Sequence, residues 1–298
     1  MAELCPTTGV DRILLSTDGS EYSEGAAREA INLSRKCGSK LVILSVVDAN
    51  PELDALAPQI AEKQERAARQ NLDALLDRAR KEGVEASSVV HKGEAAYKYI
   101  VEEAVKNNST LIVMGRRGRT GLKRLMMGSV TARVIGHAPC NVLVVPRAAE
   151  LGFRSIVVAT DGSRHSTAAS AEAIGLARRN GSELTVIAVV PAELATPTDI
   201  DFTMNQRELI AEREMQNAEQ NARAVKEAAQ KEQVPVKAFV MTGKPAEAVI
   251  QTAQERRADL IVLGSHGRTG VERLLMGSVA ERVIVLASCP VLVVKTGA

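Results

Sequence analysis

The sequence predicts an α/β protein with two tandem, doubly wound domains, each a five-stranded parallel sheet covered by helices on both faces. Residues 115–145 return at 264–294, and 20 of the 31 aligned positions are identical without a gap. Apolar strand-like runs alternate with helical patterns in both halves. A chain of 298 residues also suits about two domains of roughly 100–200 residues each. We therefore predict one domain over residues 1–148 and a second over 149–298.

Each half opens with a short apolar strand that leads through Thr-Asp-Gly-Ser into a helix. Apolar and small residues recur at helical spacing in the first of these helices. A serine at the end of the turn is a suitable N-cap, and a glycine stands where each helix should stop. The predicted strands are 12–16 and 155–159, the helices are about 22–37 and 166–180, the caps are Ser20 and Ser163, and the stop signals are Gly38 and Gly181.

The remaining elements follow in the same order in both halves. The second strands are continuous apolar runs, a pattern typical of strands buried on both faces of a parallel sheet. In the first domain we predict strands at 41–47, 86–91, 110–114 and 142–145, with helices at about 57–82, 94–107 and 129–137. In the second we predict strands at 184–190, 236–241, 259–263 and 291–294, with helices at about 204–232, 245–256 and 278–286. The joint at 146–153 is short, so we expect the domains to touch.

Composition argues against several classes of partner. The net charge is only +2 and aromatic residues make up 2% of the chain, so we expect no nucleic-acid surface and no base-stacking platform. No apolar run approaches the roughly 18 residues of a membrane span. The N-terminus lacks the basic and apolar regions of a signal peptide. We therefore expect a cytoplasmic protein without a membrane partner.

The four cysteines show no Cys-x-x-Cys pairing, which weakens both a metal site and a disulfide framework. In a reducing cytoplasm we expect free thiols at Cys5, Cys37, Cys140 and Cys289. Cys140 and Cys289 occupy equivalent positions before the last strands, where small buried residues are the favoured interpretation. A thiol switch between the two halves is the alternative.

The repeated glycine segment carries the main functional signal. Two glycines spaced as Gly-x-x-Gly let the main chain approach a ligand closely. A Gly-Ser pair then begins a helix, whose unpaired N–H groups and positive dipole end suit phosphate. A glycine-rich turn beside a solvated basic face is the simpler interpretation of one such pattern. The full spacing, its repetition and its place between strand and helix favour phosphate binding at Gly115, Gly118, Gly128 and Ser129, and at Gly264, Gly267, Gly277 and Ser278.

An aspartate follows the first strand of each half. Ligands of open α/β sheets bind outside the carboxyl ends of the strands, where the strand order reverses. If the order is 3-2-1-4-5, that place lies between strands one and four. Asp18 would then face Gly115, and Asp161 would face Gly264. Each carboxylate could accept hydrogen bonds from a ribose or a purine, although an Asx-turn is the structural alternative.

Both halves resemble domains of the universal stress protein family of the ATP-binding kind. The family pattern Gly-x2-Gly-x9-Gly followed by Ser or Thr is met in both copies, and the Thr-Asp-Gly-Ser turns and terminal Val-Leu-Val-Val strands also match. The resemblance covers nearly the whole chain. It departs at Asn141, where Pro is common, and at Arg116-Arg117, where Ser-His or Ser-Arg is usual. Those departures put the charge of the first site in doubt, not its spacing.

The resemblance implies one site per domain for ATP, or for ADP or AMP, and leaves open whether Mg²⁺ accompanies it. It implies that the aspartates contact the nucleoside and that Val46 and Val189 meet the adenine through their backbone. It also implies that the last strands pair, here between the two halves, or in a homodimer. The candidate nucleotide-binding residues are Ser16, Asp18, Val46, Met114, Gly115, Gly118, Arg119, Gly128, Ser129 and Val130 in the first domain. In the second they are Ala159, Asp161, Val189, Leu263, Gly264, Gly267, Arg268, Gly277, Ser278 and Val279.

Three functions remain open at this point. The first is a regulatory protein of the stress response that binds an adenine nucleotide. The second is a weak ATPase or a self-phosphorylating enzyme, and the third is an assembly protein with vestigial sites. No P-loop lysine follows the glycines, and the histidines are dispersed in the sequence, so we name no catalytic residue. Of His91, His137, His165 and His266, only His266 lies in the loop. The protein partner is unknown.

Overall fold

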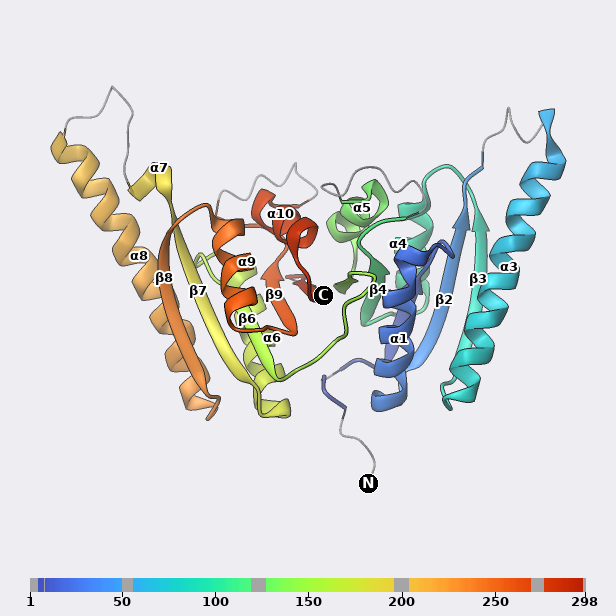
Figure 1. Cartoon of the computed structure of the whole chain (residues 1–298), viewed down its shortest axis with the longest axis horizontal. Coiled ribbons are helices and arrows are strands. Elements are labelled where there is room, and N and C mark those ends of the chain that lie inside the picture. Colours follow the sequence, from blue (N-terminus) through green and yellow to red (C-terminus); the bar gives the residue numbers. More distant parts are fainter. Residues whose placement is uncertain are drawn as a thin grey trace. The chain divides into compact units, whose positions relative to one another are not determined.

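The computed structural model describes residues 5–7, 9–49, 56–118, 127–195, 204–268 and 276–296. The chain divides into two compact units, Met1–Leu151 and Gly152–Gly297. Both are α/β units with a parallel sheet, which confirms the predicted fold class (Figure 1). None of the helices within these described residues is long and apolar enough to cross a membrane.

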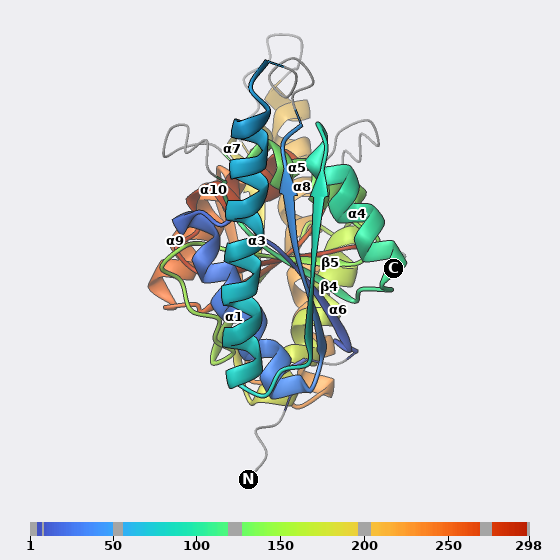
Figure 2. The ribbon, with the colours of Figure 1, turned by 90° about the vertical axis from the view of Figure 1, so that its right-hand side faces the viewer.

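The first unit has the strand order β3-β2-β1-β4-β5, and its printed strand pairs are all parallel. The helices α1 and α3 lie on one face of this sheet, and α4 lies on the other (Figure 2). The strands are β1 (Arg12–Ser16), β2 (Lys40–Val47), β3 (Ala86–Lys92), β4 (Leu111–Gly115) and β5 (Asn141–Val145). The helices are the 3-10 turn η1 (Glu21–Ser23), α1 (Glu24–Cys37), α3 (Pro58–Lys81), α4 (Ala96–Lys106) and α5 (Ser129–His137).

The second unit repeats this order as β8-β7-β6-β9-β10. Its strands are β6 (Ser155–Ala159), β7 (Glu183–Pro191), β8 (Val236–Gly243), β9 (Leu260–Gly264) and β10 (Val291–Val294). Its helices are α6 (Arg164–Asn180), α7 (Ala192–Ala195), α8 (Met204–Lys231), α9 (Pro245–Glu255) and α10 (Ser278–Leu286). The short helix α7 has no counterpart among the predicted elements.

The central strands are buried on both faces, as their continuous apolar sequence predicts. Ile13, Leu14 and Leu15 of β1 are 0% exposed, and every residue of β4 is buried. Side chains on both sides of a strand can be buried only if helices cover both faces of the sheet. Helices therefore cover both faces of the sheet, and a ligand can reach the strands only at their carboxyl ends.

The helix ends agree with the sequence in three of four places. Gly38 and Gly181 follow α1 and α6 in the left-handed conformation, with φ of 66° and 64°. Ser163 caps α6, because its hydroxyl accepts a hydrogen bond from the Ser166 N–H at 3.2 Å. Ser20 stands at the N-cap position of η1, the 3-10 turn that leads into α1, but its side chain makes no capping hydrogen bond. Its hydroxyl donates instead to Asp18 Oδ1 at 2.7 Å, and Ser23 stands at the N-cap of α1.

The cysteines differ from the expectation of free thiols. Cys5 and Cys37 form a disulfide, with their Cα atoms 4.4 Å apart. The pairing joins the segment before β1 to the last residue of α1, two places that the sequence separates by 32 residues. No local spacing signals such a pair, which is why the sequence did not reveal it. Cys140 and Cys289 are buried free cysteines, as predicted.

Candidate functional site

The site in the second unit lies at the carboxyl ends of β6 and β9. These two strands pair in parallel, with Val158 opposite Val262, although more than 100 residues separate them along the chain. β6 is also the strand at which the order reverses, because it pairs with β7 on its other side. The turn after β6 and the glycine loop after β9 therefore meet at one edge, as the predicted strand order requires.

Asp161 connects the two segments. Its Oδ1 accepts a hydrogen bond from the Ser163 N–H at 3.0 Å, and its Oδ2 accepts one from the Arg268 N–H at 2.8 Å. Burial would raise the pKa of this carboxyl, but hydrogen bonds from Ser163, Ser166 and Arg268 outweigh it and hold the pKa below its ordinary value. Asp161 is thus a carboxylate at neutral pH.

The glycines of the loop are packed closely against this turn. A Cβ on Gly264 would lie 2.6 Å from the backbone carbon of His165, and one on Gly267 would lie 2.8 Å from Asp161 Oδ2. Gly277 differs, because its nearest contact would be 3.3 Å away and its φ of −69° suits any residue. The fold itself explains the first two glycines better than it explains Gly277.

All of the residues predicted for the second site line a single cavity of about 240 Å³. Asp161 and Gly267 contribute from the two loops, and the first turn of α10 contributes from the helix. Val189 lies near the end of β7, and Pro245 and Val249 add apolar surface from α9. The cavity therefore combines an apolar side with a helix N-terminus and a carboxylate. The predicted lining residues are Ala159, Asp161, Val189, Leu263, Gly264, Gly267, Arg268, Gly277, Ser278 and Val279.

A histidine pair beside this cavity was missed from the sequence. The rings of His165 and His266 are 5.2 Å apart, and both Nδ1 atoms lie within 3.4 Å of the buried Ser265 hydroxyl. His165 Nδ1 also lies 2.9 Å from Thr296 Oγ1. Burial, followed by the nearby charge of His266, lowers the pKa of His165. The expectation of dispersed histidines was therefore wrong for this pair, which parallel strands bring together.

The first unit arranges its residues in the same way. Asp18 lies beside the loop, since a Cβ on Gly118 would be 2.7 Å from its Oδ2. The Gly128 N–H donates to the Arg116 carbonyl at 3.1 Å, and the Thr131 hydroxyl donates to the Gly115 carbonyl at 3.1 Å. Ser16 and Met114 end or nearly end the paired strands β1 and β4, and Val46 lies near the end of β2. Gly128 and Ser129 begin α5, followed by Val130, while Arg119 lies outside the described residues.

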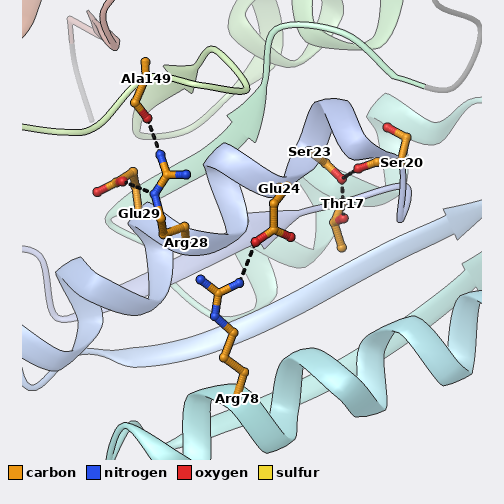
Figure 3. A network of polar contacts seen from close by, with 8 residues as sticks. All are labelled: Thr17, Ser20, Ser23, Glu24, Arg28, Glu29, Arg78 and Ala149. Atoms are coloured by element: carbon orange, nitrogen blue, oxygen red, sulfur yellow. Dashed lines mark hydrogen bonds and ion pairs between the residues drawn. The ribbon is translucent and has the colours of Figure 1, made fainter.

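Hydroxyl groups hold the first βα turn of this unit in place. Thr17 Oγ1 and Ser23 Oγ lie 2.8 Å apart, and the Ser23 hydroxyl also donates to the Ser20 carbonyl at 2.9 Å (Figure 3). The second unit has the corresponding contact of Thr160 with Ser166 at 3.4 Å. The turn that carries the aspartate is therefore built by the same residue types in both units.

The two loops differ in charge. Arg116 and Arg117 follow β4, whereas Ser265 and His266 stand at the same places after β9. Burial lowers the pKa of Arg116, and the neighbouring charge of Arg117 lowers it further. An arginine remains charged at neutral pH all the same. The first loop thus carries fixed positive charge where the second carries a titratable ring.

Comparison with known proteins agrees with the repeat. The model of the universal stress protein family matches residues 9–146 and again 152–295. Universal stress protein MJ0531 of Methanocaldococcus jannaschii is 39% identical over 145 residues, which cover 48% of this chain and 82% of that protein. Universal stress protein Rv1996 of Mycobacterium tuberculosis is 28% identical over 309 residues, covering 95% of this chain and 94% of the relative.

The fold is also shared over the full length. A universal stress protein of Archaeoglobus fulgidus has a crystal structure that covers 98% of this chain and 98% of its own, with a TM-score of 0.75 at 22% identity. The sequence match in both halves and the fold match across the whole chain agree. The protein belongs to the universal stress protein family, with two domains of that family in tandem.

Proposed function

We propose that the chain is a stress-response regulatory protein that binds an adenine nucleotide, ATP or a related compound, at one site in each domain. The observation that carries this proposal is the cavity of the second unit, which gathers all ten residues predicted for it from sequence alone. A nucleotide needs apolar surface for the base, an acceptor for the ribose and N–H groups for the phosphates. Val189 and Val249, Asp161, and the start of α10 provide these in turn.

Gly277 and Gly128 support the phosphate end of the proposal. Each precedes a helix with an ordinary extended backbone, and a Cβ on either would meet no protein atom closer than 3.3 Å. A Cβ on Gly128 would make an ordinary contact at 3.5 Å, so packing and backbone angle give no reason for glycine there. At Gly277 the contact with His266 Cα at 3.3 Å would require only a small shift, so packing gives a weak reason. Close approach of a ligand to the main chain is a physical reason for omitting a side chain there.

Binding is tested by extracting any nucleotide from the purified protein with acid and by calorimetric titration with ATP and ADP. We expect two sites per chain with micromolar affinity or tighter, roughly −8 kcal/mol. Gly277→Val should remove the second site only, and Gly128→Val the first only. Gly175→Ala, a change on α6 outside the candidate nucleotide cavity where a Cβ meets no atom within 4 Å, is the control. Unchanged stoichiometry in both valine variants would count against the proposed sites.

Slow hydrolysis is the second candidate function, and the histidine pair is what favours it. His266 lines the cavity and is hydrogen-bonded to Ser265. A turnover assay with ATP, run on the protein and on His266→Gln, separates a binding protein from a weak ATPase. Release of phosphate that is lost in His266→Gln with binding retained would establish the enzyme. We further propose that the protein is cytoplasmic and, as the family resemblance implies, that its two domains pair through their last strands.

A further inference from the structure

An ion pair joins the glycine loop of the second unit to the long helix α8. Arg268 Nη2 lies 2.9 Å from Glu214 Oε2. Arg268 directly follows Gly267 in the loop, whereas Glu214 lies in the N-terminal half of α8. The Glu214 side chain is only 20% exposed and the Arg268 side chain is 43% exposed. Arg268 is therefore held twice, through its backbone N–H by Asp161 and through its side chain by α8.

Arg268 is the member of this pair that a nucleotide would meet. It lines the candidate nucleotide cavity, and Glu214 is not among the lining residues. Among the described residues that line this cavity, Arg268 is the only arginine or lysine. Its guanidinium is the fixed positive charge that the loop offers to a polyphosphate, but in the structure a carboxylate is already bound to it. Carboxylate and phosphate oxygens bind a guanidinium in the same way, through charge-assisted hydrogen bonds.

The two units can be aligned along α3 and α8 through contacts that both units make. In each unit a Cβ on the glycine of the first βα turn would collide with an asparagine of the long helix. In each unit an arginine near the end of the first helix also pairs with a glutamate just beyond the long helix. The colliding pairs are Gly19 with Asn71 and Gly162 with Asn221, and the ion pairs are Arg35 with Glu82 and Arg178 with Glu232. Both contacts give the same offset between α3 and α8.

The first unit has no carboxylate at the place of Glu214. By this alignment Gln64 of α3 corresponds to Glu214, just as Arg78 corresponds to Ala228. A neutral amide competes for a guanidinium less well than a carboxylate does, because a hydrogen bond between two charged groups is roughly twice as strong as a neutral one. The competing carboxylate at this place is therefore a feature of the second unit.

The helix that carries Glu214 is fixed on the sheet. Ala218 and Ala222 of α8 are buried in one cluster with Ala188 and Val190 of β7, and Met215 packs against that cluster. Glu214 directly precedes Met215. Because α8 is anchored at the neighbouring residue, its carboxylate is held at a fixed place beside the loop. Arg268 is the partner that can change its contact when a ligand enters the cavity.

We propose that Glu214 competes with the phosphates of a bound nucleotide for Arg268, and that it thereby lowers the affinity of the second site according to the number of phosphates. This inference rests on the proposed function of that site. Binding of ATP would replace the Glu214 carboxylate with phosphate oxygens at the Arg268 guanidinium. The mostly buried carboxylate would then lose its partner, which opposes binding. Adenosine has no phosphate, so its binding would leave the ion pair intact.

The exchange also links the second site to α8. With ATP bound, Glu214 no longer connects the helix to the glycine loop, whereas without a nucleotide it does. Occupancy of the cavity would therefore change a contact of α8, although this helix supplies no residue to the cavity lining. In the first unit Gln64 provides no such charged connection.

The test is calorimetric titration with ATP, AMP and adenosine of the chain carrying Gly128→Val, which leaves only the second site. Adding Glu214→Gln should raise ATP affinity about fivefold at low salt, as the loss of a competing ion pair predicts. The gain should be smaller for AMP and absent for adenosine. Glu212→Gln is the matched control, because it removes the same charge from an exposed position of the same helix, and residues two apart on a helix do not face each other. Its affinities should change little.

A second readout follows the guanidinium directly. The Nε–H resonance of Arg268 is identified in the NMR spectrum by its loss in Arg268→Lys. ATP should shift this resonance in the Gly128→Val chain, because the partner of the guanidinium changes. Adenosine should leave it in place. A resonance that ATP does not move would show that Arg268 stays on Glu214, which contradicts the exchange.

The affinities separate the inference from the function on which it rests. An ATP affinity that is unchanged or lower in Glu214→Gln would overturn the inference alone, because the carboxylate would then not compete with phosphate. An equal gain for adenosine, or an equal gain in Glu212→Gln, would also overturn it, since the effect would not involve Arg268 and phosphate. If the Gly128→Val chain with Glu214 intact binds no ATP, the proposed function of the second site fails and the inference fails with it.

Discussion

Asp161 accepts a hydrogen bond at 2.8 Å from the backbone N–H of Arg268, a residue 107 positions away in the chain. The bond joins the turn after β6 to the glycine loop after β9. The same carboxylate holds the Ser163 N–H through its other oxygen. One side chain thus fixes the relative position of the two segments from which a nucleotide site would be built.

Asp161→Asn should release the loop. Two backbone N–H groups need acceptors, and an amide has one acceptor oxygen where the carboxylate has two. The unpaired group costs about 1–3 kcal/mol, so hydrogen exchange at the Arg268 or the Ser163 amide should speed up at least tenfold. Exchange measured by NMR checks this, with Asp18→Asn as the control that leaves both of these amides unchanged. Equal protection in Asp161→Asn would show that the bond does not hold the loop.

The same contact predicts the effect of acid. The pKa of Asp161 is lower in the folded protein than the ordinary value near 3.9. Its contribution to stability is therefore complete above the unfolded pKa and is lost as the pH falls through the folded one. Protection of the Arg268 amide should stay constant from neutral pH down to about pH 4 and decrease below it. A decrease already between pH 7 and pH 5 would point to another group.

The histidine pair predicts a difference between the two nucleotide sites. Arg116 and Arg117 carry fixed charge in the first loop, but His165 has a lowered pKa and is neutral near pH 7. Polyphosphate bound nearby should favour the protonated ring, so ATP binding by the second site should take up protons. The groups that face the pair are Asp161, Arg164, Arg268, Lys295 and the Ser265 and Thr296 hydroxyls.

The measurement is the binding heat in buffers of different ionisation enthalpy at pH 6.5–7. Gly128→Val isolates the second site, and Gly277→Val isolates the first. The heat should depend on the buffer for the second site and not for the first, and His165→Gln with His266→Gln should abolish the dependence. Binding without any dependence on buffer would refute this prediction and leave the proposed function intact.

The sequence predicts the fold and the loops well for a physical reason. Buried parallel strands require continuous apolar runs, and the turns after them require glycine and aspartate at fixed spacing, so both leave local patterns. The approach of His165 to His266 leaves no local pattern, because parallel pairing of β6 with β9 creates it. The bond between Cys5 and Cys37 is likewise a long-range contact. The second unit also lacks a counterpart of the ion pair between Arg78 and Glu24, because Ala228 stands at the place of Arg78. Only a comparison of the two units reveals this difference.

Glu172 and Glu29 should respond oppositely to neutralisation. They hold corresponding positions on α6 and α1, but Arg28 Nε contacts Glu29 Oε1 at 2.8 Å (Figure 3), and position 171 is alanine. Burial raises the pKa of Glu172. A carboxyl whose pKa is raised by folding contributes most to stability below its pKa in the unfolded chain. That contribution is lost as the pH rises through its pKa in the folded protein.

At pH 7 the charge on Glu172 therefore lowers the stability of the fold, and Glu172→Gln should raise the melting temperature of the second unit. Glu29→Gln leaves Arg28 with a neutral amide oxygen in place of the carboxylate and should lower the free energy of unfolding by about 1 kcal/mol. Thermal unfolding of both variants at pH 4 and pH 7 measures the two effects. The gain in Glu172→Gln should shrink at pH 4. A gain of equal size at both values would exclude ionisation as its cause.

Reduction of the bond between Cys5 and Cys37 should destabilise the first unit alone. The bond closes a loop between residues 32 positions apart, for which chain entropy corresponds to about 3–4 kcal/mol. The second unit has Asn180 where the first has Cys37, and its Cys289 is a buried free thiol, so dithiothreitol has no disulfide to reduce there. Dithiothreitol should therefore lower the melting temperature of the first unit and leave that of the second unchanged.

Cys5→Ser is the control for this prediction. It should melt at the temperature of the reduced protein with or without dithiothreitol, because it cannot form the bond. If the unmodified chain melts identically in both conditions, the bond contributes nothing to the stability of the first unit.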